Sequence, residues 1–237
     1  MRIFCFWVYN HVMSDLLIGA GRKSPIELPE ATSGDFRIEH HDGIHKLVGK
    51  ETGIWMTDYP IEVKQMYEAV VAVNASGIGL VGGLGLGVVA EFLGERDSVK
   101  SLDIIERSQD VVNLVAKNLI YQEKFNIIVE DINVFLRQLT EWPYDFAILD
   151  TWMGSSAETW LVQVLPQRRL IANRFGKQNV HCWVENEMKA ELLKLLTTKS
   201  PYWILSKMSM PMSNEDALWF MDNVGLPEWE EKYGDKI

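Results

Sequence analysis

A glycine-rich turn is the first feature of this sequence that suggests chemistry. Residues 82–87 read GGLGLG and directly follow the apolar run 78–81, while a stretch with helical periodicity comes next. Glycines permit a tight turn and let a ligand approach the backbone, and the first N–H groups of a helix have no partners within it. We therefore expect a ligand to approach the backbone at Gly83, Gly85 and Gly87; the alternative is a tight strand-to-helix turn without a ligand.

Carboxylates follow the next three apolar runs of the chain. Glu106 ends the second run, Glu130 and Asp131 follow the third, and Asp150 follows the fourth. Glu106 lies about 20 residues after the glycines, where an acidic side chain can bind ribose hydroxyls. Asp150 could orient an amine or take its proton. Asp131 and Asp150 could instead cap the helices that follow them, because Asp is a favoured N-cap residue. Trp152 could form a wall for the substrate or belong to the core.

Alternating strands and helices would bring these residues together. Asp42-Gly43 between short apolar runs predicts a β-hairpin or a small meander within residues 36–57. From residue 59 strand and helix patterns alternate, which predicts a parallel sheet with helices on both faces. Ligands bind beyond the carboxyl ends of such strands. The expected strands are 78–81, 99–105, 127–129, 146–149, 180–184 and 203–208, and a long helix is expected over 156–174.

Composition limits the partners of the protein. The 237 residues include 23 basic and 33 acidic side chains, for a formal net charge of −10. Such a surface repels phosphate backbones, so we expect no nucleic-acid partner. The two cysteines, Cys5 and Cys182, and the scattered histidines predict neither a disulfide framework nor a metal site. We expect a cytoplasmic protein without a membrane span, and leave open a homodimer and a start at Met1 or Met13.

The ordered set of motifs resembles the class I S-adenosylmethionine-dependent methyltransferases, and within them the spermidine-synthase-like branch. The resemblance covers about residues 53–185. It rests on these segments: WMTD at 55–58, LVGGLGLG at 80–87, IIERS at 104–108, VEDI at 129–132 and YDFAILD at 144–150.

The resemblance implies a fold and a set of ligand contacts. The fold would be a doubly wound, Rossmann-like α/β domain over 59–237, with a seven-stranded, mostly parallel sheet whose last strand is antiparallel. Residues 1–58 would form an extension with a β-hairpin. The implied cofactor is S-adenosylmethionine. The glycines would contact its methionyl part, Glu106 the ribose, Asp131 and Ile132 the adenine, and Asp150 the methionyl amine or the acceptor. Arg107, next to Glu106, is also expected among the cofactor-binding residues.

Departures from the family patterns leave several functions open. Aminopropyltransferases carry an Asp where this chain has Leu86, and a second acid where it has Met153. Our first interpretation is a methyltransferase acting on a small molecule or a protein. The alternatives are an aminopropyltransferase-like enzyme and a non-catalytic relative that binds a nucleoside or a partner. Residues 85–90 also match the dinucleotide pattern G-x-G-x-x-A, which would favour NAD.

Overall fold

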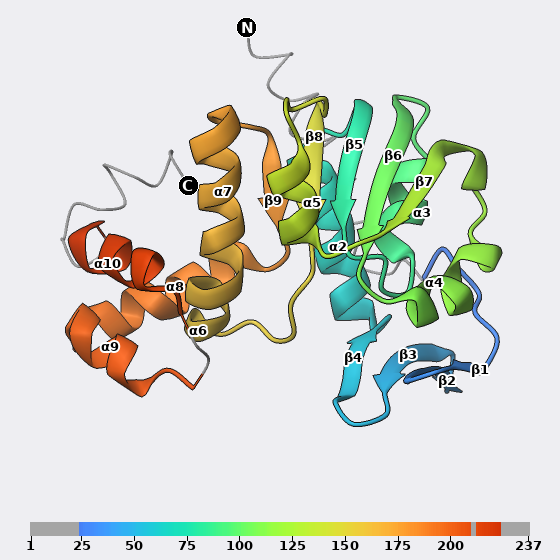
Figure 1. Cartoon of the computed structure of the whole chain (residues 1–237). Coiled ribbons are helices and arrows are strands. Elements are labelled where there is room, and N and C mark those ends of the chain that lie inside the picture. Colours follow the sequence, from blue (N-terminus) through green and yellow to red (C-terminus); the bar gives the residue numbers. More distant parts are fainter. Residues whose placement is uncertain (1–23, 210–211, 224–237) are drawn as a thin grey trace, which may run out of the picture.

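The computed structural model describes residues 24–209 and 212–223, and its elements form two sheets (Figure 1). The expectations for Cys5 and Met13 concern residues outside this described part. The smaller sheet is an antiparallel meander in the order β1-β2-β3-β4, the second of the two forms expected over residues 36–57, with β1 added before it. Its strands are β1 (Ala31–Ser33), β2 (Phe36–His41), β3 (Ile44–Gly49) and β4 (Gly53–Thr57).

The larger sheet has five strands, all parallel, in the order β7-β6-β5-β8-β9. Successive strands run outward from β5 on one side and then from β8 on the other. This arrangement is doubly wound, and its switch point lies between β5 and β8, where such sheets bind ligands. The strands are β5 (Gly77–Gly82), β6 (Val99–Glu106), β7 (Phe125–Val129), β8 (Phe146–Leu149) and β9 (Val180–Cys182).

The expectation of seven strands with an antiparallel last strand is wrong for the described residues. The apolar run at 203–208 lies largely in a helix, α9 (Pro201–Lys207), instead of a strand. Ser200 accepts a hydrogen bond from the backbone N–H of Trp203 at 3.2 Å, and Pro201 occupies the first helical turn. An N-cap followed by proline begins a helix whatever the strand propensity of the next residues, because both groups fit its unpaired first turn.

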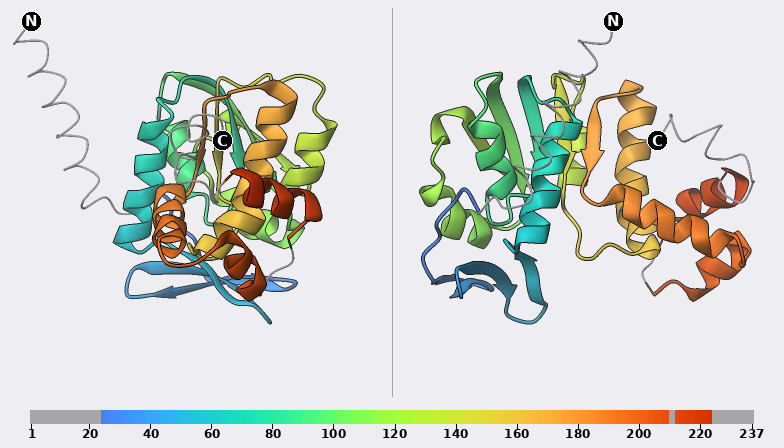
Figure 2. Two further views of the ribbon diagram at one scale, coloured as in Figure 1. Left: turned by 90° about the vertical axis from the view of Figure 1, so that its left-hand side faces the viewer. Right: turned by 180° about the vertical axis from the view of Figure 1, so that it is seen from behind.

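Helices cover both faces of the larger sheet (Figure 2). Consecutive residues of a strand point to opposite faces, so Leu80 and Val81 belong to two different hydrophobic cores. One core contains α2 (Pro60–Ala72), α3 (Val88–Gly94) and α4 (Gln109–Val115). The other contains α5 (Ile132–Gln138), α6 (Ala157–Thr159), a π-helical turn over Trp160–Val164, α7 (Leu165–Phe175), α8 (Glu185–Leu196), α9 and α10 (Asn214–Asn223). Short 3₁₀ turns occupy Ala116–Asn118 and Gln122–Lys124.

The helix expected over 156–174 is therefore interrupted by the π-helical turn. None of the helices within the described ranges combines the length and apolar character that a membrane crossing requires.

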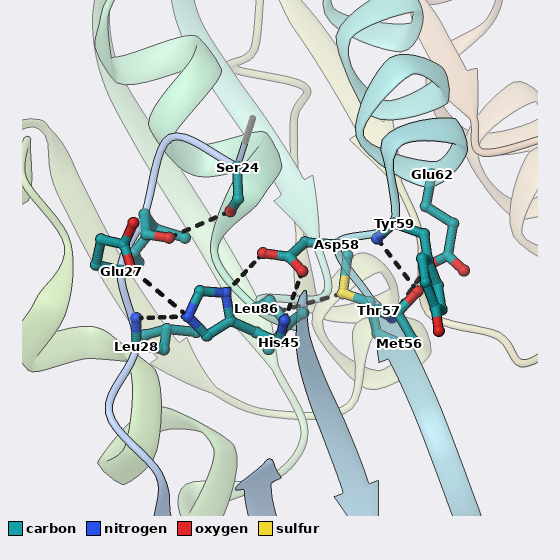
Figure 3. Close-up of polar contacts among 11 residues, drawn as sticks. Ser24, Glu27, Leu28, His45, Met56, Thr57, Asp58, Tyr59, Glu62 and Leu86 are labelled. Carbon is teal, nitrogen blue, oxygen red and sulfur yellow. Dashed lines mark hydrogen bonds and ion pairs between the residues drawn. The ribbon is translucent and has the colours of Figure 1, made fainter. Parts of the chain in front are cut away.

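A buried histidine of β3 binds the junction between β4 and α2 and the segment before β1 (Figure 3). The His45 Nδ1 lies 2.7 Å from Asp58 Oδ2, and the His45 backbone N–H donates to Asp58 Oδ1 at 2.6 Å. The backbone N–H of Leu28 donates to His45 Nε2 at 3.2 Å, which places the imidazole proton on Nδ1. Since Asp58 joins β4 to α2, these bonds fix the strand that faces the glycine turn.

Candidate functional site

A cavity of about 840 Å³ lies at the carboxyl ends of the parallel strands. Residues from the ends of β5, β6, β7 and β8 line it, together with β4 and α2 on one side and α7 on the other. Its volume falls within the usual range for small-molecule sites. The cavity therefore coincides with the switch point at which a doubly wound sheet binds its ligand.

Two of the three predicted glycines line this cavity. Gly83 has a φ of +91° and Gly85 a φ of +51°, a region that favours glycine. A side chain on Gly83 would collide with the backbone carbonyl of Asp150, and one on Gly85 with the sulfur of Met56. Met56 Sδ also accepts a hydrogen bond from the backbone N–H of Leu86 at 3.2 Å (Figure 3). The glycine turn thus closes tightly between β8 and β4.

Gly87 has a structural explanation instead. It is not among the residues that line the cavity, and it precedes α3 with a φ of +82°. A side chain there would meet Leu119, Val115 and Ile26. Its glycine character is therefore accounted for by helix packing.

Glu106 links the glycine turn to the end of β6. Its Oε2 accepts from the backbone N–H of Leu84 at 2.9 Å, and its Oε1 accepts from the N–H of Ser108 at 2.8 Å. Each carboxylate oxygen has a second lone pair, so Glu106 can still accept bonds from a ligand. The next residue, Arg107, lines the cavity with its guanidinium 5.7 Å from the Trp55 ring centre.

Asp131 and Ile132 lie together at the β7 side of the cavity. Asp131 Oδ1 accepts from the backbone N–H groups of Asn133 at 2.8 Å and Val134 at 3.3 Å, so Asp131 is the N-cap of α5. Ile132 is buried and presents an apolar surface. A capping role and a cavity position hold at the same time, because Asp131 Oδ2 takes no part in the cap.

Asp150 is not a helix cap. Its carboxylate has no hydrogen-bond or ion-pair partner among the described residues, and Ser156 caps the next helix. Burial raises the pKa of Asp150 to about 7, with a further contribution from the charge of Glu62. A carboxyl group with this pKa exchanges a proton near neutral pH, as a general base must.

Glu62 is a cavity residue that the sequence argument missed. It lies in the first turn of α2, and its Oε2 accepts from the backbone N–H of Thr57 at 3.0 Å. An acidic residue in a first helical turn has an ordinary explanation in the helix dipole, so the sequence offers no signal for a further role.

On the α7 side, the cavity is lined by tryptophans and by Gln167, whose side-chain amide makes only part of its possible hydrogen bonds. Trp152, 5% exposed, and Trp183 line it, which agrees with either expectation for Trp152, a cavity wall or a core residue. Gln167, 4% exposed, donates from Nε2 to Thr151 Oγ1 at 3.0 Å, and its Oε1 has no partner among the described residues. Sequence reasoning also missed Trp183 and Gln167.

Acidic side chains outnumber basic ones in the lining of the cavity. Among the described residues that line it, six are acidic and two are basic: Glu62, Glu106, Glu130, Asp131, Asp150 and Asp216 against Arg107 and Arg137. A cleft lined mainly by one sign of charge concentrates ligands of the opposite sign. The cavity is therefore suited to a cationic ligand.

Comparisons with known proteins yield similarities of fold only. No family model and no curated protein sequence matches this chain. A probable spermidine synthase from Corynebacterium glutamicum is similar at a TM-score of 0.47 and 11% identity, over 63% of this chain and 61% of that one. A protein from Streptococcus mutans described as a SAM-dependent methyltransferase has a TM-score of 0.42 and 13% identity, over 73% and 49%.

A precorrin-8w decarboxylase from Methanobacterium thermoautotrophicum has a TM-score of 0.38 and 17% identity, over 53% of this chain and 66% of that one. The chain thus spans about three fifths of the synthase and half of the streptococcal protein. These similarities are too distant to assign an activity, so the functional argument rests on the site.

Proposed function

We propose that this protein is an S-adenosylmethionine-dependent methyltransferase that acts on a small-molecule or protein acceptor. One observation carries the proposal. A cavity at the switch point of a doubly wound sheet joins the glycine turn after β5 to carboxylates at the ends of β6, β7 and β8. This arrangement provides backbone for close approach, acceptors for ribose hydroxyls and an unpaired carboxylate at the centre.

The residues of the cavity fit the cofactor that the proposal requires. Glu106 would accept bonds from the ribose, Asp131 and Ile132 would contact the adenine, and the turn at Gly83 and Gly85 would face the methionyl part. When bound, the cofactor would supply a methyl group already activated by a sulfonium. The protein then has mainly to align the acceptor and manage its proton. The excess of acidic side chains favours a ligand with positive charges.

The same charge argues against a dinucleotide cofactor. A pyrophosphate at the start of α3 would add negative charge to a cavity with six acidic and two basic side chains. Gly87 is the second glycine of the G-x-G-x-x-A pattern, where a pyrophosphate would have to approach the backbone. The space beside it is filled by Leu119 and Val115. Both observations favour a sulfonium nucleoside over NAD.

The acidic excess also favours a second candidate, aminopropyl transfer. A decarboxylated donor lacks the one anionic group of S-adenosylmethionine, and so would meet less repulsion in this cavity. Mass spectrometry of the ligand retained by the purified protein distinguishes the candidates. Adenosylmethionine or adenosylhomocysteine supports methyl transfer, and the decarboxylated donor or methylthioadenosine supports aminopropyl transfer.

A Glu106→Ala substitution tests the proposed cofactor site. Hydrogen bonds to a charged acceptor contribute about 1.5–3 kcal/mol each, so we expect S-adenosylmethionine to bind at least roughly tenfold more weakly by calorimetry. Glu106 also accepts two backbone N–H groups, and a thermal melt will show whether the fold persists. Glu123→Ala, at an exposed position outside the cavity, is the matched control. Equal affinities for the two variants would refute the assignment.

A further inference from the structure

Uncharged residues line most of the cavity beside α7. This part, the α7 side, includes Trp152, Val162, Pro166, Gln167, Trp183 and Asp216. Among these residues only Asp216 is charged, and it is ion-paired with Arg169 and accepts from Ser213 Oγ at 2.6 Å. The remaining acidic and basic side chains of the described lining come from α2, from the ends of β6, β7 and β8, and from α5. The α7 side is therefore a neutral region next to a charged one.

Two hydrogen bonds bring three residues of the α7 side to the end of β8. Trp152 closely follows Leu149, the last residue of β8. The backbone N–H of Trp183, directly after β9, donates to the Leu149 carbonyl at 2.9 Å. Gln167 Nε2, from α7, donates to Thr151 Oγ1 at 3.0 Å. Trp152, Gln167 and Trp183 are therefore gathered around the segment 149–152, although they come from distant parts of the sequence.

Polar atoms of these three residues are buried without a partner. Gln167, 4% exposed, has an Oε1 without a hydrogen bond among the described residues, and the same holds for the Nε1 groups of Trp152 and Trp183. The Thr151 hydroxyl can donate as well as accept, so turning the Gln167 amide around would leave its Nε2 unpaired instead. Buried polar atoms without partners are costly, and in native proteins they call for an explanation such as a ligand. A ligand group that both donates and accepts would complete these bonds.

We propose that the α7 side binds a neutral aromatic compound with a hydroxyl group, its ring packed on the tryptophans and its hydroxyl bonded to Gln167. This inference rests on the proposed function and specifies the class of acceptor that binds beside the cofactor. A phenolic hydroxyl can donate to Gln167 Oε1 while its oxygen accepts from an indole N–H. Aromatic rings pack well on tryptophan, and Val162 and Pro166 add apolar surface.

Charged, apolar and aliphatic ligands fit this side less well. Moving an unpaired charge from water to a buried site is costly, and the Asp216 carboxylate already has its counter-charge in Arg169. A fully apolar ring would leave the buried Gln167 Oε1 unpaired. An aliphatic alcohol would satisfy Gln167 without the gain from packing flat rings together. Neutral charge, an aromatic ring and a hydroxyl group therefore each contribute to recognition.

Equilibrium dialysis with two model compounds tests the ligand class. 2-Naphthol carries the hydroxyl group, and 2-fluoronaphthalene has the same rings and nearly the same size without a donor. Each is measured on the wild type at pH 7, with and without saturating S-adenosylhomocysteine. We expect 2-naphthol to bind at least roughly fivefold more tightly, because only it pairs Gln167. It should change the S-adenosylhomocysteine affinity by less than about threefold, because the two ligands occupy different sides of the cavity.

Two substitutions assign the contacts. Gln167→Leu should weaken 2-naphthol binding roughly fivefold and change 2-fluoronaphthalene binding by less than about twofold, because only the hydroxyl uses the amide. Trp183→Leu should weaken both compounds alike, by roughly fivefold, because both use its ring. The matched controls are Gln138→Leu and Trp203→Leu, at solvent-exposed positions outside the lining of the cavity. Thermal melts show whether each variant is folded.

The outcomes separate the aromatic site from the proposed function. If S-adenosylhomocysteine does not bind the wild type, the methyltransferase proposal fails, and the ratio of the two naphthalene affinities still decides whether the α7 side recognises a hydroxyl group. If it binds, the aromatic site is refuted and the cofactor proposal stands under any of three results. These are equal binding of the two naphthalenes, displacement of S-adenosylhomocysteine by 2-naphthol, and a Gln167→Leu variant that matches Gln138→Leu.

Discussion

Replacement of Asp150 by Asn should change how the stability of the protein depends on pH, and this test needs no knowledge of the acceptor. Burial, with the added charge of Glu62, raises the pKa of Asp150 from its usual value near 4 to about 7. The folded protein therefore binds this proton more tightly than the unfolded chain does. The associated stability is fully present below about pH 4 and is lost as the pH rises through about 7.

The magnitude follows from linkage. Integrated between pH 5 and pH 8, a shift of this size corresponds to roughly 2.5 kcal/mol of unfolding free energy. Asp150 faces a cavity that admits water, which screens the carboxylate, so we expect about 1–2 kcal/mol. Asn keeps the size of the side chain but does not ionise. The stability of Asp150→Asn relative to the wild type should thus increase by that amount from pH 5 to pH 8.

Urea denaturation followed by tryptophan fluorescence at pH 5 and pH 8 measures this difference. Asp97→Asn, at an exposed position before β6, controls for the amide substitution itself. If the stability difference between Asp150→Asn and the wild type is the same at both pH values, Asp150 does not have a raised pKa, and its role as a base near neutral pH is refuted.

Two further predictions concern the elements around the cavity. His45→Ala should lower the unfolding free energy by about 2–4 kcal/mol, because it leaves the buried Asp58 carboxylate and the Leu28 N–H without a partner. Urea denaturation measures this loss. A loss below about 0.5 kcal/mol, which is typical of surface substitutions, would contradict the prediction. Gly85→Val should lower the unfolding free energy by about 2 kcal/mol or more and abolish cofactor binding, because valine is strained at a φ of +51° and would displace Met56. A variant with the melting temperature and the calorimetric cofactor affinity of the wild type would refute this prediction.

Local signals in the sequence predicted much of the parallel sheet and of its ligand edge. Apolar runs interrupted by helical periodicity placed β5 to β9, and the residues just after them marked Gly83, Glu106, Asp131 and Asp150. The strand positions agree with the structure because a buried parallel strand needs a continuous apolar run, and its first polar residue emerges at the sheet edge. The ligand contacts expected of the residues after these strands stay predictions. The strand predicted over 203–208 is wrong, because a short apolar stretch fits a helix as well as a strand. The N-cap at Ser200 favours the helix here.

Local patterns along the chain were therefore sufficient to predict the alternation of elements, the glycine turn and the carboxylates at strand ends. The packing of helices beside strands brought Glu62, Gln167 and Trp183 to the same cavity and filled the space beside Gly87. The reason is physical: these roles depend on which helix packs beside which strand, a matter of long-range contacts. A glutamate in a first helical turn has the same local sequence whether it faces solvent or a second carboxylate.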